Sequence, residues 1–274
     1  MEPKLGIVAG GGDLPAELIA ACRARGRPFF VLALVGQAEA DIVRDAPHAW
    51  IRLGEAGAGL DILRRDGVAD IVFAGKVRRP SLAELRPDKW TARAMGRIGF
   101  SLFGDDGLLK GLAKEIEAEG FRVVAPDSIL ADTLAPDGAI AGAVPDETAR
   151  ADIARGLAVA HALGAADVGQ AVVVQQGLVL GVEAAEGTDA LLARCAALRR
   201  DGPGGVLVKR SKPGQETRID LPAIGATTVE RAAEAGLRGI AVEAGRTLVI
   251  DRPAVARAAA AHGIFVVGIA IDER

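Results

Sequence analysis

The chain has 274 residues, of which 50% are hydrophobic and 25% are charged, and its formal net charge at pH 7 is −3. This length suits one large domain or two of ordinary size, with a sizeable buried core. The small negative charge excludes a strong general attraction to nucleic acid. The two cysteines fall in apolar helical patterns and the three histidines are scattered, which favours buried thiols and argues against a zinc site.

The first half of the chain alternates short apolar runs with helical patterns. We expect strands at 5–9, 29–34, 71–74 and 121–125, and helices at 15–25, 60–66 and 108–119. Alternation of this kind predicts a parallel sheet with helices on its faces. We therefore predict a Rossmann-like N-terminal domain over residues 1–133.

The segment 134–146 is rich in proline, glycine and small residues, and we interpret it as a linker. Beyond it, helices are expected at 146–163, 188–200, 229–235 and 253–262, and strands at 172–175, 178–183, 206–209, 218–221, 240–242, 247–250 and 264–269. The pair 172–175 and 178–183 predicts a hairpin around Gln176 and Gly177. This pattern indicates a second, mixed α/β domain over residues 147–274.

Neither end of the chain nor any internal run predicts a membrane span. The first apolar run stops at Gly10, which is too soon for a signal peptide, and the longest apolar runs, 29–35 and 264–271, are too short to cross a bilayer. We therefore expect a cytoplasmic protein, with contact to a membrane surface left open.

A glycine-rich loop follows the first expected strand. Gly10 and Gly12 have the spacing of a dinucleotide-binding loop, but Pro15 stands in place of the third glycine. Glycines let the backbone approach a ligand, and the helix that follows offers free N–H groups. Gly11, Gly12 and Asp13 are therefore candidates for ligand contact. A tight turn capped by Asp13 is the alternative.

Basic residues follow the third expected strand. Lys76 comes directly after it, and the segment 76–97 holds seven basic residues against two acids, with Trp90 among them. Basic residues beside aromatics suit a phosphate or an anionic membrane surface. A solvated helix face explains most of them equally well. Further on, Asp105 begins a glycine-flanked acidic pair that suits a cation, a sugar hydroxyl or a helix cap.

Two segments of the second half combine strand ends with charge. Glu183, Glu186 and Asp189 surround Thr188 at an expected helix start, where acids can bind a metal ion and the helix end favours an anion. In segment 209–225, a pyrophosphate could be neutralised by Lys209, Lys212, Gln215 and Arg218. On an extended chain Arg218 and Asp220 share one face, and an ionised Asp220 could hold magnesium or orient water. A surface cluster of ion pairs is the alternative.

These blocks, taken in order, resemble one family. They read Ala-Gly-Gly-Gly-Asp-Leu-Pro (9–15), Gly-Lys-Val-Arg-Arg-Pro (75–80), Gly-Asp-Asp-Gly-Leu-Leu (104–109), Asp-Val-Gly-Gln-Ala-Val-Val-Val (167–174), Val-Glu-Ala-Ala-Glu-Gly-Thr-Asp (182–189), Lys-Pro-Gly-Gln (212–215) and Asp-Leu-Pro-Ala-Ile-Gly (220–225). The chain resembles the UDP-2,3-diacylglucosamine pyrophosphatases of the lipid A pathway, in the form unrelated to calcineurin-like phosphoesterases. The resemblance runs from Ile7 to Ile269. Glu216 stands where many relatives are expected to have Asp.

The resemblance implies a function and a catalytic residue, and the residue patterns above supply the other site candidates. The family hydrolyses UDP-2,3-diacylglucosamine to UMP and 2,3-diacylglucosamine 1-phosphate (lipid X), uses Mg²⁺, and holds the lipid product between two domains. Water attacks the phosphorus nearer the glucosamine, and Asp220 matches the catalytic acid. We expect metal contacts from Asp220, Glu183, Glu186 and Asp189, and substrate contacts from Gly11, Gly12, Asp13, Lys76, Asp105, Gln170, Thr188, Lys209 and Lys212.

Two other classes of function compete with this hypothesis. A binding protein that senses a nucleotide sugar or phospholipid needs the glycine and lysine sites but no turnover. A nicotinamide oxidoreductase needs the complete glycine fingerprint, which is missing here. The expected partners are the substrate and lipid X, and we expect no nucleic acid. Peripheral contact with the cytoplasmic face of the inner membrane and a homodimer are left open.

Overall fold

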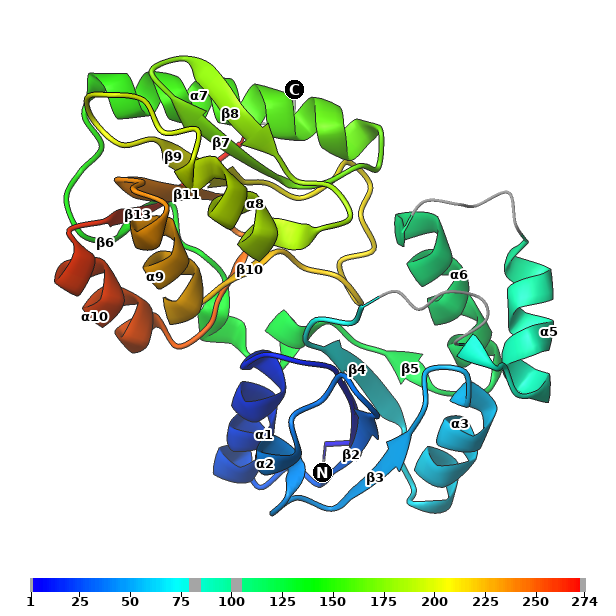
Figure 1. Ribbon diagram of the computed structural model, residues 1–274. Coiled ribbons are helices and arrows are strands. Elements are labelled where there is room, and N and C mark those ends of the chain that lie inside the picture. The colour runs from blue at the N-terminus through cyan, green and yellow to red at the C-terminus, as the bar shows by residue number, and fades with distance from the viewer. Residues whose placement is uncertain (1, 79–84, 100–104, 272–274) are drawn as a thin grey trace. The chain divides into compact units, whose positions relative to one another are not determined.

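The computed structural model describes residues 2–78, 85–99 and 105–271, and the protein divides into two compact units. The first unit is Met1–Ala131 together with Glu216–Asp220, and the second is Asp132–Gln215 together with Leu221–Arg274. The chain thus leaves the second unit for five residues and returns to it. Each unit has its own sheet and its own hydrophobic core (Figure 1).

The sheet of the first unit is five-stranded and parallel throughout, in the order β3-β2-β1-β4-β5. Its strands are β1 (Leu5–Ala9), β2 (Phe29–Leu34), β3 (His48–Ile51), β4 (Asp70–Ala74) and β5 (Arg122–Val123). This confirms the predicted parallel sheet. The strand β3 was not expected, because its four residues include the polar His48 and an exposed Trp50.

Helices cover both faces of this sheet (Figure 1). The helices α1 (Leu14–Arg25) and α2 (Ala40–Val43) pack on one face, where β1 contributes Leu5, Ile7 and Ala9. On the other face lie α3 (Ala56–Arg65) and α6 (Asp105–Ala118), and α5 (Lys89–Ile98) packs beside them. Alternate residues of a strand point to opposite faces, so a strand buried on both sides reads as a continuous apolar run.

The main sheet of the second unit is six-stranded and mixed, in the order β6-β13-β11-β9-β7-β8. Three central strands are parallel, namely β9 (Val206–Lys209), β11 (Gly239–Glu243) and β13 (Phe265–Ile269). Two strands pair antiparallel with this group, namely β6 (Gly138–Ala141) with β13 and β7 (Ala171–Gln175) with β9, and β8 (Leu178–Val182) pairs antiparallel with β7 at the edge. The short pair β10 (Ala223–Ile224) and β12 (Leu248–Val249) is parallel.

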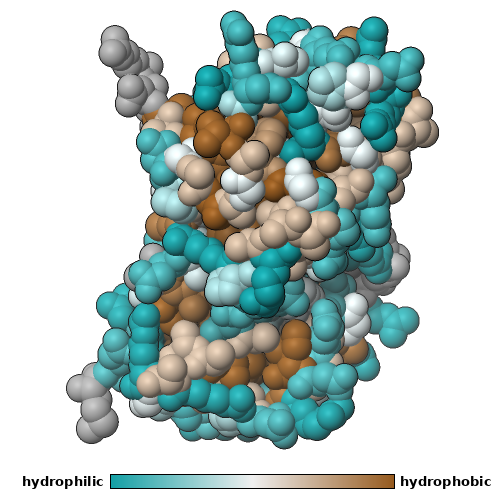
Figure 2. Space-filling model, turned by 90° about the vertical axis from the view of Figure 1, so that its left-hand side faces the viewer, coloured by the Kyte–Doolittle hydropathy of each residue, from teal (hydrophilic) through white to brown (hydrophobic). Residues whose placement is uncertain are grey.

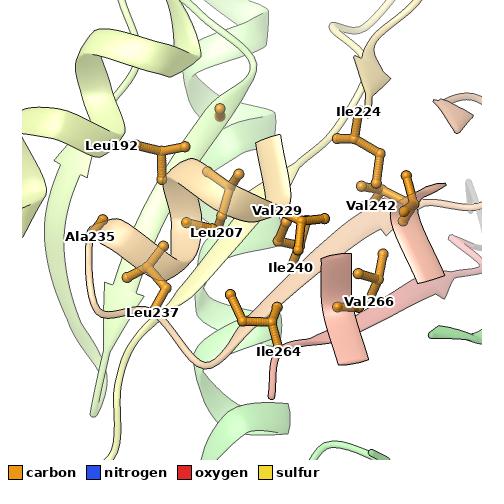
Figure 3. Close-up of a cluster of buried hydrophobic side chains, with 14 of the residues drawn as sticks. Leu192, Leu207, Ile224, Val229, Ala235, Leu237, Ile240, Val242, Ile264 and Val266 are labelled. Atoms are coloured by element: carbon orange, nitrogen blue, oxygen red, sulfur yellow. The ribbon is translucent and has the colours of Figure 1, made fainter. Parts of the chain in front are cut away.

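Helices also cover this sheet on both sides. The long α7 (Glu147–Ala165) lies on one face, and Gly156 brings it close, since a Cβ there would stand 2.4 Å from Val208. The other face carries α8 (Gly187–Ala196), α9 (Ala226–Glu234) and α10 (Arg252–His262). Between them and the strands lies the cluster of aliphatic side chains drawn in Figure 3, including Leu207, Ile240 and Val266. The predicted hairpin is confirmed, with Gln176 and Gly177 both at positive φ in its turn.

Two predicted segments have a different structure. Segment 134–146, expected to be a linker, contains β6, which pairs antiparallel with β13. Segment 218–221, expected to be a strand, begins as a turn, because the carbonyl of Glu216 accepts the N–H groups of Ile219 and Asp220, both over 3.0 Å. Both outcomes depend on contacts that the local apolar pattern does not encode.

None of the helices in the described ranges is long and apolar enough to cross a membrane. On the face shown in Figure 2, hydrophobic side chains lie among hydrophilic ones.

Candidate functional site

Polar residues of the second unit gather at one edge of its main sheet. The strand β9 ends at Lys209 and its neighbour β11 ends at Glu243. Because β7 runs in the opposite direction, its first residue is opposite Lys209, and Gln170 just before it lies at the same edge. The hairpin returns β8 to this edge, where Glu183 follows the strand. The sheet topology therefore brings Gln170, Glu183, Lys209 and Glu243 to one edge.

A hydrogen-bonded chain links three of the predicted site residues. The hydroxyl of Thr188, in the first turn of α8, donates to Glu183 Oε1 over 2.5 Å and accepts from Lys209 Nζ over 3.2 Å. Lys209 also donates to the carbonyl of Ala223, and the backbone N–H of Gln170 donates to Glu183 Oε2. Glu183 is 6% exposed and Lys209 is 7% exposed. A buried carboxylate and a buried ammonium thus each form a hydrogen bond with the same hydroxyl, as buried charged groups require.

The side chain of Gln170 offers an acceptor to this cluster. Its Oε1 is buried and has no hydrogen-bond partner among the described residues. A buried polar atom without a partner is uncommon in folded proteins and asks for an explanation. A donor group of a ligand, such as a sugar hydroxyl, would satisfy it. Within the part of the chain that the structure describes, the protein supplies no partner for this acceptor.

A second charged cluster at this edge was not predicted from the sequence. Glu243 is 4% exposed and accepts from the backbone N–H of Ser211 over 2.9 Å, with Arg210 and Arg246 at 4.0 and 3.7 Å. The sequence signal for Glu243 is the same as for Lys209, namely a charged residue that ends a buried apolar strand. Ser211 also donates its hydroxyl to the carbonyl of Arg246. The cluster fixes the loop that leads from β9 to Lys212.

Lys212 has an acidic partner within the protein. Its Nζ donates to Asp167 Oδ1 over 2.7 Å, and its backbone N–H donates to Gln215 Oε1 over 2.9 Å. Lys212 is 8% exposed. The charge of Lys212 is therefore balanced by Asp167. The side-chain amide of Gln215 holds the turn 212–215 together.

The glycine loop of the first unit uses its N–H groups internally. Gly11 and Lys76 exchange two backbone hydrogen bonds, over 2.9 and 2.8 Å, while Gly10 donates to the carbonyl of Ala74 and Gly12 donates to Glu39. This bridge joins the ends of β1 and β4, where the strand order of the sheet reverses. In dinucleotide-binding folds that position receives the pyrophosphate. Here the N–H groups of Gly10, Gly11 and Gly12 are bound to protein acceptors and not offered to a pyrophosphate, which argues against a nicotinamide cofactor.

The other predicted residues of the first unit lie near this loop or on α6. Asp13 is exposed and precedes α1, but its side chain accepts no capping hydrogen bond from the helix. Lys76 is exposed after β4. Asp105 is the first residue of α6, and its side chain lies outside the described part of the structure. Asp220 is half-buried in the segment Glu216–Asp220, which belongs to this unit.

The carboxylates expected to bind metal already have protein partners. Glu186 accepts from Arg194 over 2.9 Å, and hydrogen bonds from its own backbone N–H and from Arg194 lower its pKa. Asp189 lies 3.8 Å from Arg231, and Glu183 is engaged as described above. No group of three His, Cys, Asp or Glu side chains that could hold a metal ion occurs in the described ranges.

Comparison with known proteins also divides the chain into an N-terminal and a C-terminal part. The family model of the LpxI N-terminal domain matches residues 4–133, and that of the LpxI C-terminal domain matches residues 136–267. The chain is also 44% identical, over 278 aligned positions and 99% of each chain, to a protein of Caulobacter vibrioides named UDP-2,3-diacylglucosamine pyrophosphatase LpxI. The chain therefore belongs to the LpxI family.

Proposed function

We propose that this protein is a hydrolase of lipid A biosynthesis that cleaves the pyrophosphate bond of UDP-2,3-diacylglucosamine, releasing UMP and 2,3-diacylglucosamine 1-phosphate. The observation that carries the proposal is the 44% identity to a protein of that name over 99% of both chains. The aligned length covers both units, so the similarity is not confined to one of them. A binding protein without turnover is the main alternative.

The polar edge of the second unit supports this chemistry. A diacylated sugar nucleotide presents hydroxyl groups and a diphosphate of two negative charges. The buried Oε1 of Gln170 can accept from a hydroxyl, and the ammonium of Lys209 brings positive charge to the same edge. Charged and polar groups held in place before the substrate arrives stabilise charge that develops as a bond breaks. The network through Thr188 and Glu183 supplies that rigidity.

Asp220 is the proposed catalytic carboxylate. In the proposed reaction its carboxylate orients or deprotonates the attacking water, which adds to the phosphorus nearer the glucosamine while UMP leaves. A carboxylate in this role typically contributes about 10²–10⁴-fold to the rate. The roles of Gly11, Gly12, Asp13, Lys76, Asp105 and Lys212 as substrate contacts remain part of the proposal.

Dependence on Mg²⁺ is a further part of the proposal. Magnesium in phosphoryl-transfer sites is usually held by one or two carboxylates and the phosphates of the substrate. The described residues form no three-ligand group, so we propose that the ion enters together with the diphosphate. Because the substrate carries two acyl chains, we also propose peripheral contact with the cytoplasmic face of the inner membrane.

The proposal is tested by incubating the purified protein with UDP-2,3-diacylglucosamine in ¹⁸O-labelled water. The expected products are UMP and 2,3-diacylglucosamine 1-phosphate in equal amounts, with the label in the lipid phosphate and with no turnover when a chelator removes Mg²⁺. Tight binding of the substrate without release of UMP would instead support the binding protein. Label in UMP would reject the proposed point of attack.

A further inference from the structure

The segment that carries Asp220 is held by the first unit, although both of its neighbours in the chain belong to the second. It comprises Glu216–Asp220. Ile219 packs against the hydrophobic cluster that includes Ala113 and Ile116 of α6. Arg218 Nη1 donates to Glu117 Oε1, also on α6, over 2.7 Å. The Arg218–Glu117 ion pair joins this segment to α6, and Ile219 joins it to the hydrophobic core of the first unit.

The turn itself is organised by Glu216. Its carbonyl accepts the N–H groups of Ile219 and Asp220, and its two carboxylate oxygens accept from Arg218 Nε and Nη2 over 2.8 and 2.9 Å. The Arg218 guanidinium thereby lowers the pKa of Glu216, while Glu216 raises the pKa of Arg218. The planar fork of arginine suits this bidentate pairing and leaves Nη1 for a second carboxylate.

These contacts change the role expected of Arg218. From the sequence it was a candidate to neutralise a pyrophosphate, together with Lys209, Lys212 and Gln215. In the structure its guanidinium binds two carboxylates, those of Glu216 and Glu117, and so its charge is compensated by protein groups. Its position is two residues before Asp220, on the same turn. The geometry therefore fits a residue that acts on the placement of Asp220.

We propose that Arg218 is a positioning residue, which joins Glu216 to Glu117 and so fixes the carboxylate of Asp220 relative to α6. The inference rests on the proposed function, in which Asp220 is the catalytic carboxylate. A misplacement of a reacting group by about 1 Å can cost about 10²-fold in rate. Loosening the turn should therefore lower kcat and leave the affinity for the substrate largely unchanged.

The test compares three variants of the full chain in the hydrolysis assay. Glu117→Gln removes only the anchor on α6, and Arg218→Lys keeps the positive charge but cannot bridge two carboxylates. Both should lower kcat about 10- to 100-fold with KM changed less than about threefold. The matched control is Glu115→Gln, on the same helix, whose carboxylate pairs with Arg97 of α5. It should keep the wild-type kcat.

Combining the two changes shows whether they act on one contact. The variant with both Glu117→Gln and Arg218→Lys should lose no more than the worse single variant, because each breaks the same bridge. Hydrogen exchange at the amides of Ile219 and Asp220 should accelerate in Glu117→Gln and stay unchanged in Glu115→Gln. A purely structural contribution would lower the melting temperature and leave kcat per folded molecule unchanged.

The outcomes separate the two proposals. If the wild type releases UMP and Asp220→Ala does not, while Glu117→Gln and Arg218→Lys keep the wild-type kcat, the positioning role is overturned and the proposed function stands. If the wild type releases no UMP, the proposed function is overturned, and the positioning role fails with it.

Discussion

The hydroxyl of Thr188 lies between two buried charges of opposite sign, donating to Glu183 and accepting from Lys209. Thr188 belongs to the first turn of α8, whereas Glu183 follows β8 and Lys209 ends β9. A single side chain thus ties a helix start to two strands of the sheet.

Replacing Thr188 by valine tests that junction. Valine keeps the shape but removes the hydroxyl, which leaves both a buried carboxylate and a buried ammonium short of one hydrogen bond. We expect the free energy of unfolding to fall by about 1–3 kcal/mol and kcat/KM to fall as well. Thr188→Ser, which retains the hydroxyl, is the matched control for urea denaturation and for the assay. Equal behaviour of the two variants would show that the hydroxyl is unimportant.

Gly75 tests the bridge between the glycine loop and Lys76. Its φ is +94°, and a Cβ there would stand 2.4 Å from the carbonyl oxygen of Gly11. We expect Gly75→Ala to lower the free energy of unfolding by about 3 kcal/mol or more. The control is Gly36→Ala, also at positive φ but with open space around the new methyl group, for which about 1–2 kcal/mol is expected. If the two variants lose similar amounts of unfolding free energy in urea denaturation, the backbone bridge between Gly11 and Lys76 shifts readily to accommodate the methyl group.

The Glu216–Arg218 pair predicts a pH dependence of stability. Arg218 lowers the pKa of Glu216 below its ordinary value of 4.5. A carboxyl group with a lowered pKa in the folded state stabilises the fold above its unfolded pKa, and this contribution is lost as the pH falls through the folded pKa. The difference in unfolding free energy between the wild type and Glu216→Gln should thus be largest at neutral pH and shrink towards pH 3. A difference that is constant with pH would argue against the pair.

The sequence was sufficient for features that depend on neighbours in the chain. The apolar runs of β1, β2, β7 and β9 predicted buried strands, and the pair Gln176 and Gly177 predicted the turn between β7 and β8. The charged Lys209 was correctly expected as the last residue of its strand. Parallel order follows from the helices between strands.

Features that depend on distant residues were not accessible in this way. The turn at Glu216–Asp220 is stabilised by Glu117, 101 residues before Arg218 in the chain. The alternation of Arg218 and Asp220 with Ile219 and Leu221 imitates a strand, and nothing local reveals the partner on α6. Strand β6 was hidden for a similar reason, since its pairing with β13 joins residues more than a hundred positions apart. Glu243 was overlooked although its position at the end of an apolar strand was visible.

The central claim is that this chain splits a diphosphate with the help of the carboxylate at position 220. The most direct measurement is the rate of UMP release from UDP-2,3-diacylglucosamine in the presence of Mg²⁺, for the wild type and Asp220→Asn side by side. We predict steady release by the wild type and a rate at least about 100-fold lower for the variant, with the same thermal unfolding midpoint for both. Equal rates for the two proteins, or no UMP from the wild type, would contradict the claim.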